Sequence, residues 1–187
     1  MKKSLLVIGG ILLVVLLTIS PLIGVYNNLI TAEENVGGQW AQVENQLQRR
    51  LDLIPNLVET VKGYAAHEKE TFTLVTEARS KAAGAVGVKE KAETNSELTS
   101  ALSRLMVVVE RYPELKANEN FIRLQDELAG TENRIAIARK DYNDAVQSFN
   151  TLIKRFPNNV IAGMLNFMEK AYFEAETSAL KAPEVSF

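Results

Sequence analysis

Residues 121–156 read FIRLQDELAGTENRIAIARKDYNDAVQSFNTLIKRF, the most regular segment of this 187-residue chain. One set of positions in it alternates steps of three and four without a break: Phe121, Leu124, Leu128, Thr131, Ile135, Ala138, Tyr142, Ala145, Phe149, Leu152 and Phe156. This spacing places the set on one face of a helix and matches the heptads of a left-handed helical bundle. The pattern predicts one long helix that stops at Pro157.

A second long stripe precedes it, over residues 36–65, with apolar side chains at helical spacing. The stripe keeps its phase through Pro55, which has no backbone N–H. Pro55 should therefore kink one helix, or it marks the start of a new helix with Asp52 as its cap. We favour a kinked helix over residues 26–62 that turns near Gly63.

Two shorter stripes lie between the long ones. The first covers residues 72–82 and ends in the turn-like residues 84–87, and the second covers residues 98–112 and stops at Pro113. No segment competes as a strand. We predict an all-α fold in which two long and two short helices form an antiparallel four-helix bundle.

An amphipathic stripe follows Pro157, at Ile161, Met164, Leu165, Met168 and Tyr172. The stripe is too short to span a membrane. We interpret it as a short helix that closes the open end of the bundle, and contact with the membrane surface is the alternative. The tail, residues 181–187, contains a proline and is expected to be extended.

The N-terminal region is long and uncharged. Residues 4–32 contain no charged side chain, and residues 5–25 are almost wholly apolar. Because about 20 such residues span a bilayer, we interpret residues 1–25 as an uncleaved transmembrane helix that anchors the chain. A cleaved signal peptide is the alternative, but the small-residue cleavage pattern is poor and the apolar run continues beyond it.

The anchor divides the chain into three parts: the anchor itself (residues 1–25), the helical bundle (26–157) and a C-terminal short helix with an extended tail (158–187). Lys2 and Lys3 precede the anchor, whereas acidic residues follow it. The positive-inside rule then predicts a single-pass protein of the bacterial inner (cytoplasmic) membrane, with its N-terminus in the cytoplasm and its bundle outside.

The composition excludes several kinds of site. The chain has no cysteine and one histidine, which rules out disulfides, thiolate zinc sites, cysteine nucleophiles and sites built from several histidines. Its 21 basic and 23 acidic residues give a net charge of -2. We expect no nucleic-acid partner, because phosphate binding needs clustered basic charge, and we expect no cofactor.

The single histidine is the only candidate centre for catalysis. His67 is followed by Glu68, but a zinc-protease helix needs a second histidine where this chain has Thr71. No Ser/His/Asp arrangement can be argued from one histidine, so we expect a protein that is not an enzyme. A metal-dependent enzyme centred on His67 is the least favoured of three hypotheses for function.

Polar residues that interrupt the stripes form the candidate site. Arg50 stands where a strict repeat from Leu47 would continue, and Thr131 interrupts the stripe of the fourth helix. A boundary arginine needs a carboxylate partner, because an unpaired buried charge is costly. We predict a polar network that fixes helix register or recognises a partner, drawn from Arg49, Arg50, Asp52, Asn56, Glu59, Glu127, Thr131, Glu132, Asn133 and Arg134.

Several strings closely resemble the LemA family. They are residues 46–68, QLQRRLDLIPNLVETVKGYAAHE; residues 119–143, ENFIRLQDELAGTENRIAIARKDYN; residues 150–157; and residues 172–176 with the Ala-Pro-x-Val-x-Phe ending. Together they cover nearly the whole chain after the anchor. The chain departs from the family pattern at residues 165–171, where Asn166 and Met168-Glu169-Lys170 replace a stretch that usually carries Gly and Pro. This departure favours a helix there.

The resemblance implies a bacterial membrane-anchored protein with an extracytoplasmic antiparallel helical bundle and no established enzymatic activity. Members of the family are often encoded beside membrane metalloproteases, so the expected partner is an integral-membrane or envelope protein such as a membrane metalloprotease, or a second copy in a homo-oligomer. Our leading hypothesis is a non-enzymatic interaction or adaptor module of the cell envelope. The second is a self-assembling structural scaffold at the membrane.

Overall fold

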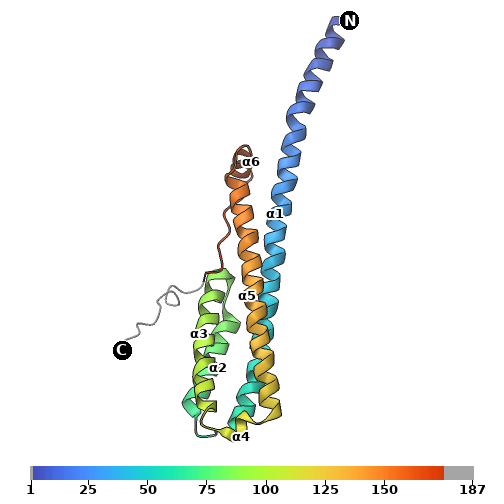
Figure 1. Ribbon diagram of the computed structural model, residues 1–187. Helices are drawn as coiled ribbons and strands as arrows, with labels where there is room; N and C mark the ends of the chain where they lie inside the picture. The colour runs from blue at the N-terminus through green and yellow to red at the C-terminus, as the bar shows by residue number, and fades with distance from the viewer. Residues whose placement is uncertain (1, 175–187) are drawn as a thin grey trace, which may run out of the picture. The chain divides into compact units, whose positions relative to one another are not determined.

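The computed structural model describes residues 2–174, and the side chains of residues 2–8, 11–19 and 21 are outside that description (Figure 1). The extended tail predicted for residues 181–187 therefore lies outside the described residues. Residues 2–174 form helices and contain no strand, which confirms the all-α prediction. The helices are α1 (Lys2–Lys62), α2 (Lys69–Gly84), α3 (Gly87–Val109), α4 (Pro113–Lys116), α5 (Glu119–Lys154) and α6 (Asn158–Met164).

Helix α1 runs without interruption through Pro55 and ends at Lys62, which confirms the predicted turn near Gly63. Its 61 residues correspond to about 90 Å of helix. The alternative of a new helix that begins at Pro55 is therefore wrong. Pro55 leaves the carbonyl of Leu51 without its usual N–H partner, and the guanidinium of Arg79 on α2 donates to this oxygen at 2.9 Å. This bond replaces the one that the proline removes.

We expect the substitution Arg79→Met to lower the free energy of unfolding by about 1–3 kcal/mol, because it leaves the carbonyl of the buried Leu51 unpaired. In a Pro55→Ala background the helix supplies its own N–H, and the same substitution should cost clearly less. Thermal unfolding of the full chain in mild detergent, followed by circular dichroism, measures the four variants. An equal cost in both backgrounds would contradict this role of Arg79.

The predicted anchor, residues 1–25, falls mostly on residues whose side chains are outside the described part of the chain. The backbone of α1 is helical through this region from Lys2 onward. Within the described residues, no helix combines the length and the apolar content that crossing a membrane requires.

The chain divides into two compact units. The first unit consists of Met1–Gly38 and Asp144–Lys170. The second consists of Gln39–Asn143 and Ala171–Phe187, and of this last segment the structure describes residues 171–174. Helices α1 and α5 are each divided between the two units, with one part of the helix in each. The antiparallel four-helix bundle, which would extend over both units, stays a prediction.

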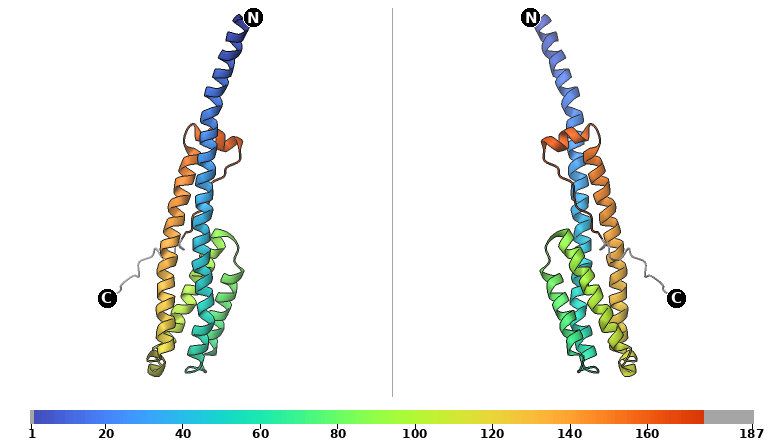
Figure 2. Two further views of the ribbon diagram at one scale, coloured as in Figure 1. Left: turned by 90° about the vertical axis from the view of Figure 1, so that its right-hand side faces the viewer. Right: turned by 90° about the vertical axis from the view of Figure 1, so that its left-hand side faces the viewer.

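The second unit has one continuous hydrophobic core. Helices α2 and α3 lie side by side and pack against the C-terminal part of α1, α4 and the start of α5 (Figure 2). The predicted stripes supply this core, whose most deeply buried members include Ile54, Val61, Val75, Leu98, Leu105, Leu115 and Phe121. Burial of these stripes confirms the helical spacing read from the sequence.

The connections around α3 follow from glycine and proline chemistry. Gly87 begins α3 with φ 77°, a left-handed backbone that only glycine adopts without strain, and the predicted turn at residues 84–87 is confirmed. The third helix was expected to continue as far as Pro113. In the structure it ends at Val109. The residue before a proline is pushed out of the helical region, and Pro113 itself opens the short helix α4 as its first residue.

The first unit has a smaller core. Leu29 and Val36 of α1 are buried there. The other buried apolar residues of this unit come from α5 and α6 and are Ala145, Val146, Phe149, Ile153, Ile161 and Ala162. The rings of Phe149 and Phe167 meet at 6.4 Å between their centres in an edge-to-face arrangement.

The helix after Pro157 is shorter than predicted. Helix α6 ends at Met164, Asn166 adopts a left-handed conformation with φ 59°, and residues 167–174 are not helical. The predicted stripe through Met168 and Tyr172 is therefore wrong, and so is the helix expected at residues 165–171.

The physical reason is a pairing that a helix could not make. The side chain of Asn150 donates from Nδ2 to the carbonyl of Lys170 at 2.9 Å and accepts from its N–H at 2.9 Å. A helix would commit both main-chain groups of Lys170 to its own ladder, whereas a non-helical segment leaves them free for the amide.

Candidate functional site

Arg50 of α1 is the centre of a polar network in the second unit. Its side chain is only 4% exposed. It donates from Nη1 to Oδ1 of Asn95 at 2.7 Å and from Nη2 to Oγ1 of Thr99 at 2.9 Å, and Nη2 lies 3.0 Å from Oε2 of Glu132. We call Arg50, Asn95, Thr99 and Glu132 the Arg50 network. It joins α1 to both α3 and α5.

The spacing of the partners on α3 explains this geometry. Asn95 and Thr99 are four residues apart and so lie on one face of the helix. The hydroxyl of Thr99 donates to the carbonyl of Asn95 at 3.0 Å, which leaves its oxygen free to accept from Arg50. One guanidinium thus binds two acceptors that a single helix presents together.

The charge of Arg50 is held in the interior. Burial lowers the pKa of Arg50 from its ordinary value, and the carboxylate of Glu132 opposes that shift. Because an arginine starts from so high a pKa, the guanidinium remains protonated. The Nε of Arg50 and the Oε1 of Gln46 are buried and have no hydrogen-bond partner among the described residues.

Arg139 of α5 is a second arginine whose positive charge the carboxylate of Glu132 favours. Burial lowers the pKa of Arg139, and Glu132 opposes this shift too. The guanidinium carbon of Arg139 also lies 4.5 Å from the ring centre of Phe173, within the range of a cation–π interaction. Glu132 therefore acts on two arginines at once.

Phe173 is locked into the second unit by its backbone as well as its ring. Its N–H donates to Oδ1 of Asn143 at 2.9 Å, and its carbonyl accepts from Nδ2 of the same amide at 3.1 Å. The ring is 2% exposed and lies 6.2 Å from that of Trp40, which packs 5.1 Å from Tyr142. The hydroxyl of Tyr142 donates to the carbonyl of Ala171 at 2.8 Å, and burial raises the pKa of Tyr142.

Three other predicted residues on α5, Glu127, Thr131 and Arg134, form a second cluster with Arg49 of α1. Arg49 donates from Nη2 to Oε2 of Glu127 at 2.8 Å, and this bond, followed by the charge of Arg49, lowers the pKa of Glu127. Arg134 lies 3.9 Å from the same carboxylate and donates to Oγ1 of Thr131 at 3.1 Å. Thr131 is fully buried and donates to the main-chain carbonyl of Glu127 at 2.8 Å.

Four residues of the predicted network lie elsewhere. Asp52 accepts a hydrogen bond from Gln48 at 2.8 Å, Glu59 pairs with Lys62 at 2.8 Å, and Asn56 and Asn133 are exposed. At about 100° per residue, positions 52, 56 and 59 project from the side of α1 opposite Arg50. They are thus turned away from Arg50 and its partners.

The prediction does not include Asn95 and Thr99 of the Arg50 network, nor Arg139, whose charge Glu132 favours. A signal existed for Asn95, because the apolar stripe of the third helix, extended back by three residues from Leu98, lands on it. Burial of Asn95 confirms that position. No comparable signal marks Thr99 or Arg139, because each depends on which helix lies opposite.

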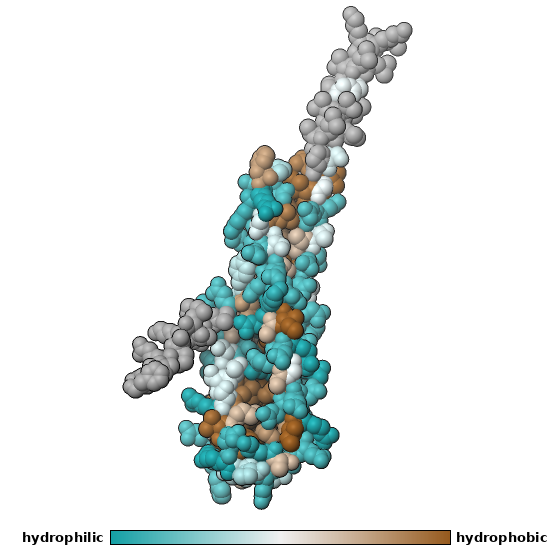
Figure 3. All heavy atoms as spheres, in the orientation of Figure 1, coloured by the Kyte–Doolittle hydropathy of each residue, from teal (hydrophilic) through white to brown (hydrophobic). Residues whose placement is uncertain are grey.

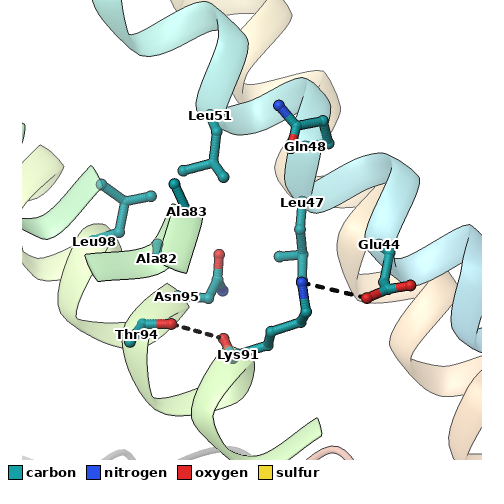
Figure 4. Close-up of a pocket in the computed structure, with 10 residues that line it drawn as sticks. All are labelled: Glu44, Leu47, Gln48, Leu51, Ala82, Ala83, Lys91, Thr94, Asn95 and Leu98. Atoms are coloured by element: carbon teal, nitrogen blue, oxygen red, sulfur yellow. Dashed lines mark hydrogen bonds and ion pairs between the residues drawn. The ribbon is translucent and has the colours of Figure 1, made fainter. Parts of the chain in front are cut away.

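A small cavity adjoins the Arg50 network, beside Asn95 (Figure 4). Its volume is about 40 Å³, and Lys91 spans it to reach Glu44 at 3.3 Å. Such a volume holds one or a few water molecules, whereas pockets for small ligands measure roughly 300–1,000 Å³. Two larger hollows, of about 390 Å³ beside Phe72 and about 260 Å³ between α2 and α3, are open to solvent.

His67 is exposed in the connection between α1 and α2. The neighbouring Glu68 is engaged by Arg111 at 2.9 Å and by the hydroxyl of Tyr112 at 3.3 Å. Within the described residues, no group of three or more His, Cys, Asp or Glu side chains is placed to hold a metal ion.

A double-mutant cycle on Arg50 and Glu132 tests the central ion pair. We expect Arg50→Met and Glu132→Gln to be coupled by about 1 kcal/mol, because one partner is buried. The matched control is Arg49 with Glu127, where both side chains are about half exposed, so that coupling should be smaller. Thermal unfolding of the full chain gives both values. Zero coupling between Arg50 and Glu132 would contradict the contact.

Comparison with known proteins supplies the family. The chain is similar to Magnetosome protein MamQ 2 of Paramagnetospirillum magneticum, with 28% identity over 182 residues that cover 83% of this chain and 67% of that protein. It is similar to Protein LemA of Metamycoplasma hominis, with 27% identity over 154 residues, or 82% of this chain and 70% of that protein. Magnetosome protein MamQ of Magnetospirillum gryphiswaldense is 25% identical over 181 residues, and the match covers 83% of this chain and 66% of that protein.

The family model of the LemA family matches residues 39–187, a range that contains the whole Arg50 network and Phe173 with its partners. This match covers well over half of the chain and confirms the resemblance carried by residues 46–68 and 119–143. The chain therefore belongs to the LemA family.

Proposed function

We propose that this protein is a non-enzymatic, single-pass membrane protein that presents an antiparallel helical bundle as an interaction or adaptor module in the bacterial cell envelope. Residues 1–25 are its anchor, residues 26–157 its bundle, and residues 158–187 a short helix with a tail. The uncharged stretch over residues 4–32 supports the anchor, because about 20 apolar residues suffice to cross a bilayer.

The charges beside the anchor support one orientation. Lys2 and Lys3 precede the uncharged stretch, and Glu33 and Glu34 follow it. The positive-inside rule then holds the N-terminus in the cytoplasm and leaves the bundle outside. The partners in reach are integral-membrane or envelope proteins, of which a membrane metalloprotease is one example.

The observation that carries the proposal is that the side chains of the Arg50 network bind one another. The guanidinium binds Asn95, Thr99 and Glu132 within the same unit, and the adjacent cavity of about 40 Å³ is too small for a metabolite. A charged group held in this way fixes which helix faces lie opposite each other. The exposed helix faces are then left to bind a partner.

Two exposed apolar side chains of the second unit are suitable reporters of such a partner. Val107 on α3 is 69% exposed and Ile137 on α5 is 61% exposed. A photo-crosslinking amino acid at either position, in the full chain in living bacterial cells, should give a discrete adduct with an envelope protein of different mass. Gln125, an exposed polar position on α5, is the control position.

The masses of the adducts separate the hypotheses. An adduct with a different envelope protein at Val107 or Ile137, and none at Gln125, supports the adaptor. An adduct of twice the chain's own mass, together with an oligomer in mild detergent, supports the alternative of a self-assembling scaffold. No adduct at either apolar position would contradict an interaction role for these faces.

A further inference from the structure

The segment between α5 and the non-helical stretch after Asn166 carries an unusual surface. Residues 156–168 read FPNNVIAGMLNFM and contain no charged side chain. Only Ile161 and Ala162 among them are buried. Loop and hairpin tips are normally polar, because they face water. Five apolar side chains at this tip, Phe156, Val160, Met164, Leu165 and Met168, are therefore exposed to solvent.

The exposed apolar side chains of this tip and of the adjoining α1 form what we call the apolar collar. Phe156 is 84% exposed and Met164 is 79% exposed. The collar comprises Phe156, Val160, Met164, Leu165 and Met168 from the tip, with Leu22, Ile23 and Tyr26 from α1. Figure 3 shows hydrophobic residues gathered at this end, over α6 and the neighbouring part of α1. An apolar cluster of this kind marks an interaction surface.

Contacts within the first unit fix the tip to α1. Lys170 pairs with Glu33 at 2.5 Å, and its main chain is held by Asn150. Leu29 of α1 is completely buried. In both views of Figure 2, α6 lies beside α1. The part of the collar on α1 lies within the uncharged stretch of residues 4–32.

We propose that the apolar collar is seated in the lipid surface of the membrane, so that the protein contacts the bilayer through α6 as well as through its anchor. This inference rests on the proposed anchoring by residues 1–25. The occupant is lipid because the collar adjoins the proposed anchor, residues 1–25. An anchor in the bilayer keeps the collar next to the membrane surface. Tyr26 suits the interface, since an aromatic ring with a hydroxyl favours headgroup depth.

Charge placement agrees with a shallow position. The tip itself is uncharged, and charged residues flank it on both sides: Lys154 and Arg155 before it, and Glu169 after it. Lys154 and Glu169 form an ion pair at 2.8 Å, which lies at the border of the collar. Apolar side chains of such a segment enter the boundary between headgroups and acyl chains while the charged border stays in water.

The absence of cysteine from the chain permits a direct test with single-cysteine variants of the full-length protein. An environment-sensitive fluorophore is attached at Phe156→Cys, Met164→Cys, Ile23→Cys or Ile137→Cys, and each protein is reconstituted in phosphatidylcholine vesicles with lipid-borne quenchers. Ile137 is the matched control, because it is an apolar, exposed residue outside the collar. All four side chains are exposed, so the labels leave the core intact, which circular dichroism verifies.

Quenching by lipid labels near the headgroup should be several-fold greater at Phe156 and Met164 than at Ile137. Ile23 belongs to residues 1–25 as well as to the collar, so quenching there tests whether the anchor enters lipid. If Ile23 is quenched but Met164 behaves like Ile137, the collar inference is wrong and the anchor stands. If Ile23 is not quenched, the anchor fails and the collar with it. Shielding of Met164 from aqueous quenchers without lipid quenching would show a protein contact, such as a second copy, and would overturn the inference.

Discussion

The substitution Phe173→Ala is expected to lower the free energy of unfolding by about 3–4 kcal/mol, the range found when a buried phenylalanine is truncated. The ring is 2% exposed and contacts Trp40 and the guanidinium of Arg139. Its loss leaves a cavity between these groups. It also removes the cation–π contact between this ring and the partly buried guanidinium of Arg139.

The neighbouring tyrosine provides a matched control for this prediction. Tyr172 is 40% exposed, so Tyr172→Ala should change stability by less than about 1 kcal/mol. Thermal unfolding of both variants as full-length protein in mild detergent, followed by circular dichroism, measures the difference. Equal costs at Phe173 and Tyr172 would mean that the segment at residues 171–174 does not contribute to the second unit.

Asn95→Leu is expected to cost about 2–3 kcal/mol, because it removes a hydrogen bond to a buried charge and leaves Nη1 of Arg50 unpaired. The change to leucine conserves volume and adds no cavity, so the lost polar contact dominates. Thr99, the second acceptor on the same face of α3, retains its bond to Nη2.

A double variant separates the polar effect from packing. In Arg50→Met with Asn95→Leu, both partners become apolar, and the double variant should be more stable than the sum of the single costs implies. Unfolding in urea gives the free energies of the wild type, both single variants and the double variant. Strictly additive costs would contradict a direct bond between Arg50 and Asn95.

The outcome for Phe156 shows where periodicity fails. The sequence places Phe156 on the stripe of residues 121–156, but the structure leaves it exposed, since α5 ends at Lys154. The spacing of a stripe tells which side chains share a helix face. It does not tell how far along that face another segment continues to cover it.

The candidate site was predicted in part for the same reason. The break in the stripe marked Arg50 and Thr131 as unusual, and the structure buries both of them. Glu132 was among the expected neighbours and lies 3.0 Å from Arg50. Asp52, Asn56 and Glu59 are expected beside them, but the angle of about 100° per residue turns these three side chains away from Arg50.

The sequence by itself determined the four longer helices α1, α2, α3 and α5, their buried stripes and the membership of the LemA family, because helical spacing is a local property and long shared strings are specific. Only the tertiary structure decided which acceptors satisfy Arg50 and why residues 167–174 are not helical. Both depend on contacts between segments distant in the chain: Asn95 is 45 residues from Arg50, and Asn143 is 30 from Phe173. A side chain that pairs with the backbone of a remote segment overrides that segment's own preference, and no pattern within the segment records it.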